Sequence, residues 1–310
     1  MEGRKLKVFI IGISGFLGHH LALRLRDKFL VSGACFSHFI NIHGCQTYGV
    51  DISRPEMLEA LLRVQAPDIV INAIGISDRR TIADQGKTAE SINILLPVSF
   101  AVLAYKMRAQ FIHLSCAEVF EGNEGPYREE DYHFSMHDSF GKQKIQAESY
   151  IRAQTMESTI LRVGRVIGAG NFYRMNEFDK VRARFAAKRE TEFSKLRFYS
   201  YLSVFSFVSA VEALLLNPNV GKHRLFHLGG ANLTEFDFYA GFAEMAYGHS
   251  KLVRPMADDG PMNFSLISDA FARANPEWQP ETAGTLFLHV LEQLCPGVGA
   301  KKWQKTLRTP

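Results

Sequence analysis

Three glycines near the start of the chain have the spacing of a phosphate-binding turn. Gly12, Gly15 and Gly18 lie between an apolar run that predicts a strand over 7–12 and an amphipathic run that predicts a helix from Phe16. Without side chains there, backbone N–H groups and a helix N-terminus can approach a pyrophosphate. The alternative is a tight strand-to-helix turn without a ligand. The residues predicted to bind the cofactor here are Gly12, Ser14, Gly15, Phe16, Leu17 and Gly18.

The end of the second predicted strand bears on the choice of dinucleotide. An acidic residue at this point would hold the adenosine ribose hydroxyls of NAD, but the chain has Ser37 and His38. These side chains tolerate a 2′-phosphate better than an aspartate would, so the sequence favours NADP over NAD. Asp51 and Ile52 follow the third predicted strand, where Asp51 is a candidate acceptor for the adenine amino group. An acid placed near a helix start is the alternative for Asp51.

Apolar strand patterns alternate with helical patterns over the first half of the chain. Short apolar runs separated by helices predict a parallel sheet covered on both faces, a Rossmann-like doubly wound α/β fold. After about residue 168 the alternation gives way to loops, a strand-like stretch at 223–230 and a helix N-capped by Thr234. We therefore expect a dinucleotide-binding domain over 1–168 and mainly a smaller C-terminal substrate lobe over 169–310, with some segments returning to the sheet.

The predicted elements before residue 168 are strands at 7–12, 29–36, 47–51, 68–75, 110–115 and 158–166, and helices from Phe16 to about Lys28 and at 54–64, 88–107 and 139–153.

Composition excludes several classes of function. The chain has 310 residues, 46% of them hydrophobic and 22% charged, with a formal net charge of +4. This charge is too small to indicate a nucleic-acid partner, although acidic small molecules remain compatible with it. The four cysteines show no CxxC spacing, so no metal site or disulfide framework is expected. No run approaches the roughly 18 continuous apolar residues of a membrane span, and a cytoplasmic, reducing location is the default.

Several motifs in order carry a family resemblance. They are "GISGFLG", "VDIS", "PDIVINAIG", "SIN" at 91–93, "FIHLSCAEVFEG", "PYREED", "FGKQKIQAE" and "LRVGRVIGAGNF". With them the chain resembles the extended short-chain dehydrogenase/reductase superfamily, particularly its dTDP-4-dehydrorhamnose reductase-like (RmlD-like) branch. That branch also contains the regulatory β subunit of methionine adenosyltransferase, a non-catalytic relative. The resemblance implies NAD(P) binding and a nucleotide-sugar substrate.

The resemblance also implies a catalytic tyrosine with a lysine four residues later on one helix face. The lysine lowers the phenol pKa, and the phenol transfers the proton that accompanies hydride transfer. Lys144 matches the lysine, but Phe140 stands at the tyrosine position. The hydroxyl that binds the substrate carbonyl falls on Cys116, a poorer hydrogen-bond donor. Because losing a positioned acid or base costs about 10² to 10⁴ in rate, ordinary ketone reduction should be crippled.

The cofactor pocket implied by the resemblance is better preserved than the catalytic groups. Ala73, Ile74 and Gly75 form the end of the fourth predicted strand, and Lys144 can bind the nicotinamide ribose. Asn93 matches the family's helix asparagine, with a structural and water-holding role. Cys116 can be interpreted as a nucleophile whose thiol pKa the lysine lowers, or as a small buried residue at a strand end.

Neighbouring side chains offer an alternative source of the proton. His137 and Asp138 immediately precede the helix of Lys144, and Tyr127 and Tyr132 lie in the same loop. None of them occupies the helical position that Lys144 would tune. A polar surface loop is the alternative interpretation.

Substrate residues are expected within and after the strand at 158–166. The resemblance places a cleft-shaping loop there, which makes Arg162, Arg165, Asn171 and Phe172 the candidates. The basic run 179–190 could attract a diphosphate, or it could form a solvated helix face.

Two classes of function remain open. The first is an NAD(P)-binding protein with a degenerate catalytic triad, weak or no reductase activity and a binding or regulatory role toward a partner enzyme. The second is an active NAD(P)H-dependent reductase, or epimerase, of a nucleotide-linked keto-deoxysugar that uses a surrogate proton donor. Phe140 and Cys116 favour the first. A homodimer through the long helices is a further expectation.

Overall fold

The computed structural model describes the chain except for residues 1–3, 155–157, 172–174, 218–223, 259 and 296–310. The chain divides into two compact units. Unit 1 comprises residues 1–121, 134–162 and 208–226, and unit 2 comprises 122–133, 163–207 and 227–310.

A seven-stranded sheet is the centre of unit 1. Its strand order is β10-β6-β5-β4-β1-β2-β3, and β1 pairs in parallel with both β2 and β4. The order runs outward from β1 in both directions, which is the doubly wound arrangement and confirms the predicted Rossmann-like fold. The strands are β1 (Lys7–Ile11), β2 (Leu30–Cys35), β3 (Gln46–Gly49), β4 (Ile69–Asn72), β5 (Gln110–Cys116), β6 (Ser158–Val163) and β10 (Arg224–Leu228).

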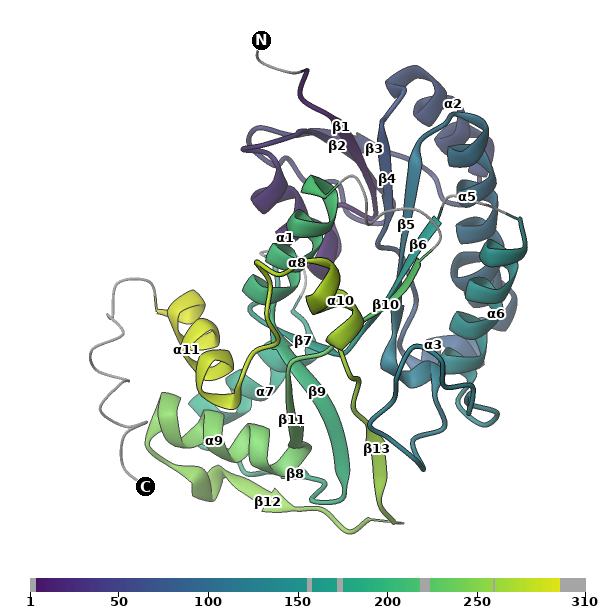
Figure 1. The fold of residues 1–310 in the computed structure, drawn as a ribbon. Helices are drawn as coiled ribbons and strands as arrows, with labels where there is room; N and C mark the ends of the chain where they lie inside the picture. Colours follow the sequence, from purple (N-terminus) through teal and green to yellow (C-terminus); the bar gives the residue numbers. More distant parts are fainter. Residues whose placement is uncertain (1–3, 155–157, 172–174, 218–223, 259, 296–310) are drawn as a thin grey trace. The chain divides into compact units, whose positions relative to one another are not determined.

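Helices cover both faces of this sheet (Figure 1). On one face, Phe9 of β1 packs in one apolar cluster with Leu58 of α2, Phe100 of α5 and Ile151 of α6. On the other face α1 lies beside the 208–216 part of α8, and Glu212 accepts two hydrogen bonds from Arg24, at 2.9 and 2.6 Å. The helices are α1 (Phe16–Leu25), α2 (Pro55–Gln65), α3 (Arg79–Asp84), α5 (Leu96–Lys106), α6 (Ser139–Gln154) and α8 (Val204–Leu216).

The helix predicted over 88–107 is continuous but changes its winding. Helix α4 (Gly86–Glu90) leads into a π-helical turn, Ser91–Leu95, which continues into α5. Such π-turns often mark functional sites. By length and composition alone, the run Gly86–Lys106 is apolar enough to cross a membrane, and half of its most apolar window is buried inside the protein.

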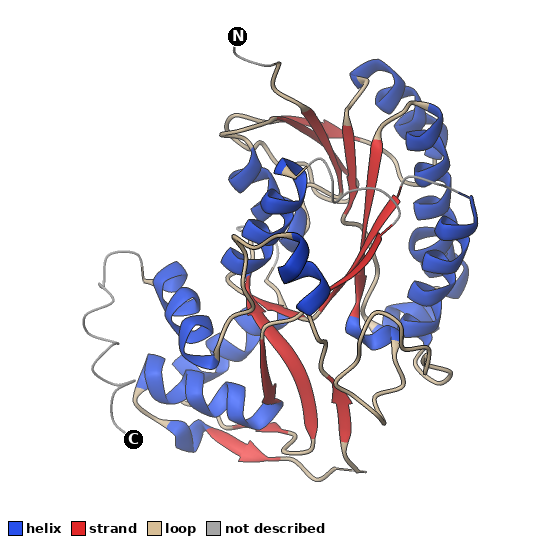
Figure 2. Ribbon diagram, viewed as in Figure 1, coloured by secondary structure: helices blue, strands red, loops and turns tan. Residues whose placement is uncertain are grey.

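Unit 2 is built on a second, smaller sheet (Figure 2). Strand β9 (Arg197–Ser203) pairs antiparallel with β11 (Ala231–Thr234) and in parallel with β7 (Arg165–Ile167) and β13 (Met262–Phe264). Helix α9 begins as predicted, because the Thr234 side chain accepts a hydrogen bond from Asp237 N. The other elements are β8 (Thr191–Phe193), β12 (Val253–Pro255), α7 (Glu177–Ala186), α9 (Glu235–Tyr247), α10 (Asp269–Ala274) and α11 (Ala283–Leu294).

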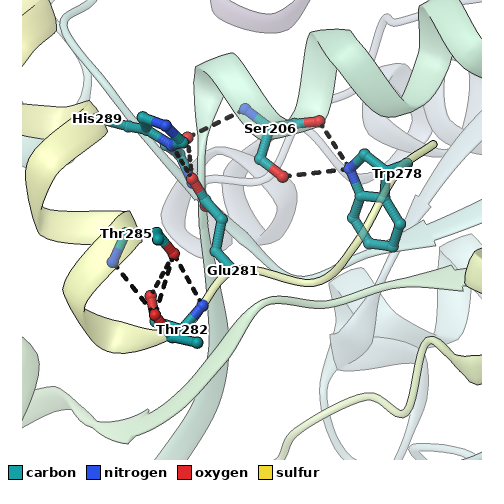
Figure 3. Close-up of polar contacts among 7 residues, drawn as sticks. Ser206, Trp278, Glu281, Thr282, Thr285 and His289 are labelled. Atoms are coloured by element: carbon teal, nitrogen blue, oxygen red, sulfur yellow. Dashed lines mark hydrogen bonds and ion pairs between the residues drawn. The ribbon is translucent and has the colours of Figure 1, made fainter.

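A polar cluster fixes the start of α8 in unit 2 (Figure 3). The buried Glu281 carboxylate accepts hydrogen bonds from Ser203 N, Ser203 Oγ and His289 Nδ1, at 2.6, 2.7 and 2.5 Å. The Trp278 indole donates to Ser206 in the first turn of α8. Helix α11 is thereby tied to the turn between β9 and α8.

Three expectations from the sequence were wrong in detail. The first helix ends at Leu25 rather than near Lys28. The strand predicted over 158–166 is interrupted at Gly164, where a Cβ would lie 2.3 Å from the Ser200 carbonyl oxygen, and becomes β6 and β7. The stretch expected to be mainly loops holds α8, whose nearly all-apolar sequence shows no helical period, and several strands of three or four residues.

Candidate functional site

The glycine turn after β1 has a geometry that only glycine permits. Gly12 has φ +88°, in the left-handed region, and its N–H donates to the Ala34 carbonyl of β2 at 3.0 Å. A Cβ on Gly18 would lie 2.2 Å from the Gly12 carbonyl oxygen, so α1 packs directly on the turn. A Cβ on Gly12 would lie 2.7 Å from Ile74 Cγ2, which places the residues after β4 against the turn.

The start of α1 suits a phosphate-bearing dinucleotide. Gly15 is its N-cap, no side chain caps the helix, and its first turn carries no acidic residue. Free N–H groups and the positive end of the helix dipole are thus left to meet an anion. The glycine cradle and this uncapped helix end fit the cofactor that the motif predicts.

The two loops after β2 and β3 are exposed. Ser37 and His38 hydrogen-bond to each other, with 3.0 Å between Ser37 Oγ and His38 Nδ1. The Asp51 carboxylate accepts from Ser53 N and Ser53 Oγ, and these bonds lower its pKa. Asp51 therefore organises the turn before α2, while Ile52 beside it is half-buried.

Lys144 lies in the interior of unit 1 at the end of β5. Its side chain is 5% exposed, and Nζ donates to the Leu114 carbonyl at 3.0 Å. A Cβ on Gly75 would lie 3.4 Å from both Lys144 Nζ and Asn93 Oδ1, so these three predicted cofactor residues meet at one point. Burial lowers the pKa of Lys144, and the nearby Glu148 carboxylate partly offsets this effect.

Asn93 holds the loop after β4 in place from the π-helical turn. Its Oδ1 accepts from Ile76 N at 2.8 Å, and its Nδ2 donates to Ile76 O at 2.9 Å and to Gln143 Oε1 at 2.7 Å. Asn93 was predicted from the sequence, whereas Gln143 and Ile76 were not. The position of Gln143, three residues after Phe140 on the same helix, was the available signal.

Phe140 is packed in an apolar environment. It is 8% exposed and forms a small cluster with Ile82 and Ala89, against which Ile76 and Cys116 pack. The Lys144 ammonium lies 5.8 Å from the centre of the Phe140 ring.

The thiol of Cys116 is not activated as a nucleophile. Burial raises the pKa of the Cys116 thiol well above its ordinary value, and the nearby Glu118 carboxylate adds to this shift. The neutral thiol is therefore the stable form. This environment favours the interpretation of Cys116 as a small packed residue over that of a nucleophile.

A buried ion pair lies one helical turn beyond Lys144. Arg162 and Glu148 are each 1% exposed, and Arg162 Nη2 donates to Glu148 Oε2 at 2.8 Å. Ser115 Oγ donates to the same carboxylate at 2.5 Å, and the Arg162 guanidinium lies 4.9 Å from the Phe120 ring centre. Arg162, a substrate candidate from sequence, is thus enclosed within unit 1 and ties β5, α6 and β6 together.

The other substrate candidates belong to unit 2 or fall outside the described residues. Arg165 Nη1 donates to Glu235 Oε1 at 2.6 Å, and its guanidinium stacks 3.3 Å from the Tyr199 ring centre. Asn171 is half-buried. Phe172 lies outside the described residues. The role of these residues in substrate binding stays a prediction.

Three of the four candidate proton donors have other contacts, and the fourth is exposed. Asp138 accepts from Arg79 and from Gly141 N at the start of α6, and His137 is exposed and 3.7 Å from Glu121. In unit 2, Tyr127 is buried and its Oη accepts from Gly122 N at 3.0 Å. Tyr132 is 75% exposed. No group of three or more potential metal ligands occurs among the described residues.

Comparison with known proteins identifies the family. The model of the RmlD substrate binding domain matches residues 6–263. The chain belongs to this family. It is 26% identical over 187 residues to dTDP-4-dehydrorhamnose reductase of Aggregatibacter actinomycetemcomitans, covering 59% of the chain and 58% of the relative. It is 23% identical over 255 residues to methionine adenosyltransferase 2 subunit beta of Pongo abelii, covering 78% of the chain and 74% of the relative.

Solved structures with the same fold include two proteins in complex with nicotinamide dinucleotides. The dTDP-4-dehydrorhamnose reductase of Bacillus anthracis in complex with NADP has a TM-score of 0.76 at 16% identity, covering 93% of the chain and 99% of that structure. The Bordetella bronchiseptica enzyme WbmG in complex with NAD has a TM-score of 0.77 at 15% identity, covering 94% of each. The matches span about half the length of the first curated relatives.

Proposed function

We propose that this RmlD-family chain is an NAD(P)-binding protein with little or no ketone reductase activity and a binding or regulatory role. The observation that carries the proposal is Phe140 at the position that Lys144 would tune, packed among Ile82, Ala89 and Cys116. A phenyl ring has no ionisable proton at any pH, and the neighbouring thiol is neutral. The position therefore offers neither a proton donor nor a strong carbonyl hydrogen-bond donor.

The chain's own residues still provide a cofactor pocket. In this proposal the glycine turn lets the pyrophosphate approach the N–H groups at the start of α1, and Lys144 binds the nicotinamide ribose. When bound, the nicotinamide would supply or accept hydride. Ser37 and His38 support NADP over NAD, because no carboxylate stands there to repel a 2′-phosphate.

The residues near α6 do not supply an evident substitute for the missing phenol. Asp138 bonds Arg79 and Gly141 N, which fixes the start of the helix, and His137 points into solvent with an 89% exposed side chain. A surrogate donor must lie within about 3.2 Å of the atom that it protonates, directly or through one water. These contacts favour the binding role over the active reductase.

The relatives suggest what the protein binds. One is a reductase of a nucleotide-linked sugar, and another is a subunit of a methionine adenosyltransferase. We propose a nucleotide-sugar-like small molecule or a partner enzyme as the second ligand, the partner enzyme being favoured by the loss of the phenol.

A titration followed by a turnover assay tests this function. Purified protein is titrated with NADPH and with NADH by fluorescence, and dTDP-4-keto-6-deoxysugar is then added while nicotinamide absorbance is recorded. Saturable binding of NADPH without its oxidation is the expected result. Steady turnover would contradict the loss of activity, and no binding of either cofactor would reduce the glycine turn to a structural feature.

A further inference from the structure

The charge of Lys144 is poorly balanced by its surroundings. The ammonium is buried, donates to the Leu114 carbonyl at 3.0 Å and lies 5.8 Å from the centre of the neutral Phe140 ring. The carboxylate that acts on it is that of Glu148. Glu148 already accepts hydrogen bonds from the buried Arg162 guanidinium and from Ser115 Oγ, so its negative charge is compensated elsewhere.

Among the described residues, two other titratable groups interact with Lys144, and both are held neutral. The Cys116 thiol is neutral because burial and Glu118 raise its pKa. His113 of β5 is fully buried and neutral because burial and the Lys144 charge lower its pKa well below the ordinary value. With Lys144, Glu148 and Arg162 counted together, one positive charge is left over beside Gly75, where a Cβ would be 3.4 Å from Lys144 Nζ.

We propose that this pocket selects the reduced form of the nicotinamide cofactor. The inference rests on the proposed function, in which Lys144 binds the nicotinamide ribose. The oxidised nicotinamide ring carries a positive charge and the reduced ring carries none, so the uncompensated ammonium repels the oxidised form alone. In a partly desolvated site this repulsion is far stronger than in water. A tyrosine at position 140 could moderate it as a phenolate, which Phe140 cannot form.

Selective binding would make the protein a reader of cofactor redox state. A tenfold preference for the reduced form raises the midpoint potential of the bound two-electron couple by about 30 mV. Occupancy then follows the amount of reduced cofactor rather than the whole pool. This is a property that a regulatory protein can use without turning over a substrate.

Calorimetric titration of the full chain with NADPH and, separately, with NADP⁺ tests the inference. We expect NADPH to bind at least about tenfold more tightly, given the repulsion between two unit charges at short range. Lys144→Met removes the charge but keeps an unbranched chain, and should bring the two affinities within about threefold of each other. Lys142→Met on the exposed side of the same helix is the matched control and should keep the wild-type ratio.

A second variant tests the inference if Lys144→Met binds neither form of the cofactor. Cys116→Asp places a carboxylate beside the ammonium and should lower the preference for NADPH in the same titrations. Equal affinities in the wild type, or an unchanged ratio in both Lys144→Met and Cys116→Asp, would overturn the selectivity. Failure of the wild type to bind either form would instead remove the proposed function on which it rests.

Discussion

The glycine turn after β1 and the start of α6 both lie in unit 1. The turn follows the pattern expected of the family, whereas the start of α6 departs from it at Phe140. The turn has the left-handed Gly12 and the close contact of Gly18 with the Gly12 carbonyl on which the proposed phosphate binding depends. The start of α6 keeps Lys144 but presents Phe140 where a phenol would act. Under the proposed function, the first region binds the cofactor and the second no longer transfers a proton.

The difference between the two regions follows from how each function is encoded. Phosphate binding depends on backbone positions, so a side chain added at Gly12 or Gly18 would collide with neighbouring atoms. Proton transfer depends on a single oxygen, whose absence from Phe140 leaves the packing against Ile82 and Ala89 intact. A fold can therefore lose the second function at almost no structural cost while the first remains.

One of the two largest expected effects comes from damaging the turn itself. Gly18→Ala would place a Cβ 2.2 Å from the Gly12 carbonyl oxygen and force the turn to move. We expect affinity for NADPH to fall about 100-fold or more, equivalent to about 2.8 kcal/mol, in a fluorescence titration. Gly86→Ala, where a Cβ meets nothing within 4 Å, is the control. Unchanged NADPH affinity in a folded Gly18→Ala variant would contradict the proposed role of the turn in cofactor binding.

The framework beneath Lys144 should be as sensitive as the turn. Glu148→Gln leaves the Arg162 guanidinium buried without its counter-charge. Removing one partner of a buried pair costs about 3 to 5 kcal/mol of unfolding free energy, to be measured by urea denaturation. The exposed Glu56→Gln on α2 should change little. A loss of unfolding free energy below about 1 kcal/mol would show that the buried ion pair contributes little to stability.

The Asn93 contacts should give a smaller and graded response. Asn93→Ala leaves the N–H and carbonyl of Ile76 without their partner, at a cost of about 2 kcal/mol, whereas Gln143→Ala removes one hydrogen bond and costs about 1 kcal/mol. Urea unfolding of both variants measures the difference. Equal losses would mean that the Ile76 contacts contribute nothing.

The smallest effect concerns unit 2, outside both regions. The hydrogen bond to Glu281 raises the pKa of His289, so this pair stabilises the folded protein at pH below about 6.5 and loses that contribution as pH rises through the raised value. His289→Gln should therefore lose up to about 1 kcal/mol relative to wild type at pH 6 and less at pH 9. His43→Gln, which is exposed, is the control. A deficit that grows with pH would contradict the assignment.

The fold of unit 1 was readable because buried parallel strands are short apolar runs between amphipathic helices. Unit 2 was less readable. Helix α8 is apolar on nearly all sides, and β7, β8, β12 and β13 have three residues each, too few to show an alternating pattern. Their pairing depends on partners distant in sequence, such as β9 with β13.

Parts of the candidate site could likewise be predicted from the sequence, and other parts could not. The glycine spacing predicts its turn because the constraint is on the backbone at three positions. The hydrogen bonds of Asn93 to Ile76 and Gln143 depend on a π-helical turn that no residue pattern predicts. The compensation of Glu148 by Arg162 likewise required the structure, because these residues come from different elements.

The most direct measurement restores the two changed groups in the retained pocket. The double variant Phe140→Tyr, Cys116→Ser is compared with wild type at saturating NADPH and dTDP-4-keto-6-deoxysugar, and NADPH oxidation is followed by absorbance. The account predicts similar NADPH affinity in both proteins and turnover at least about 100-fold faster in the variant, the lower end of what a positioned acid contributes. Wild-type turnover equal to that of the variant would contradict it.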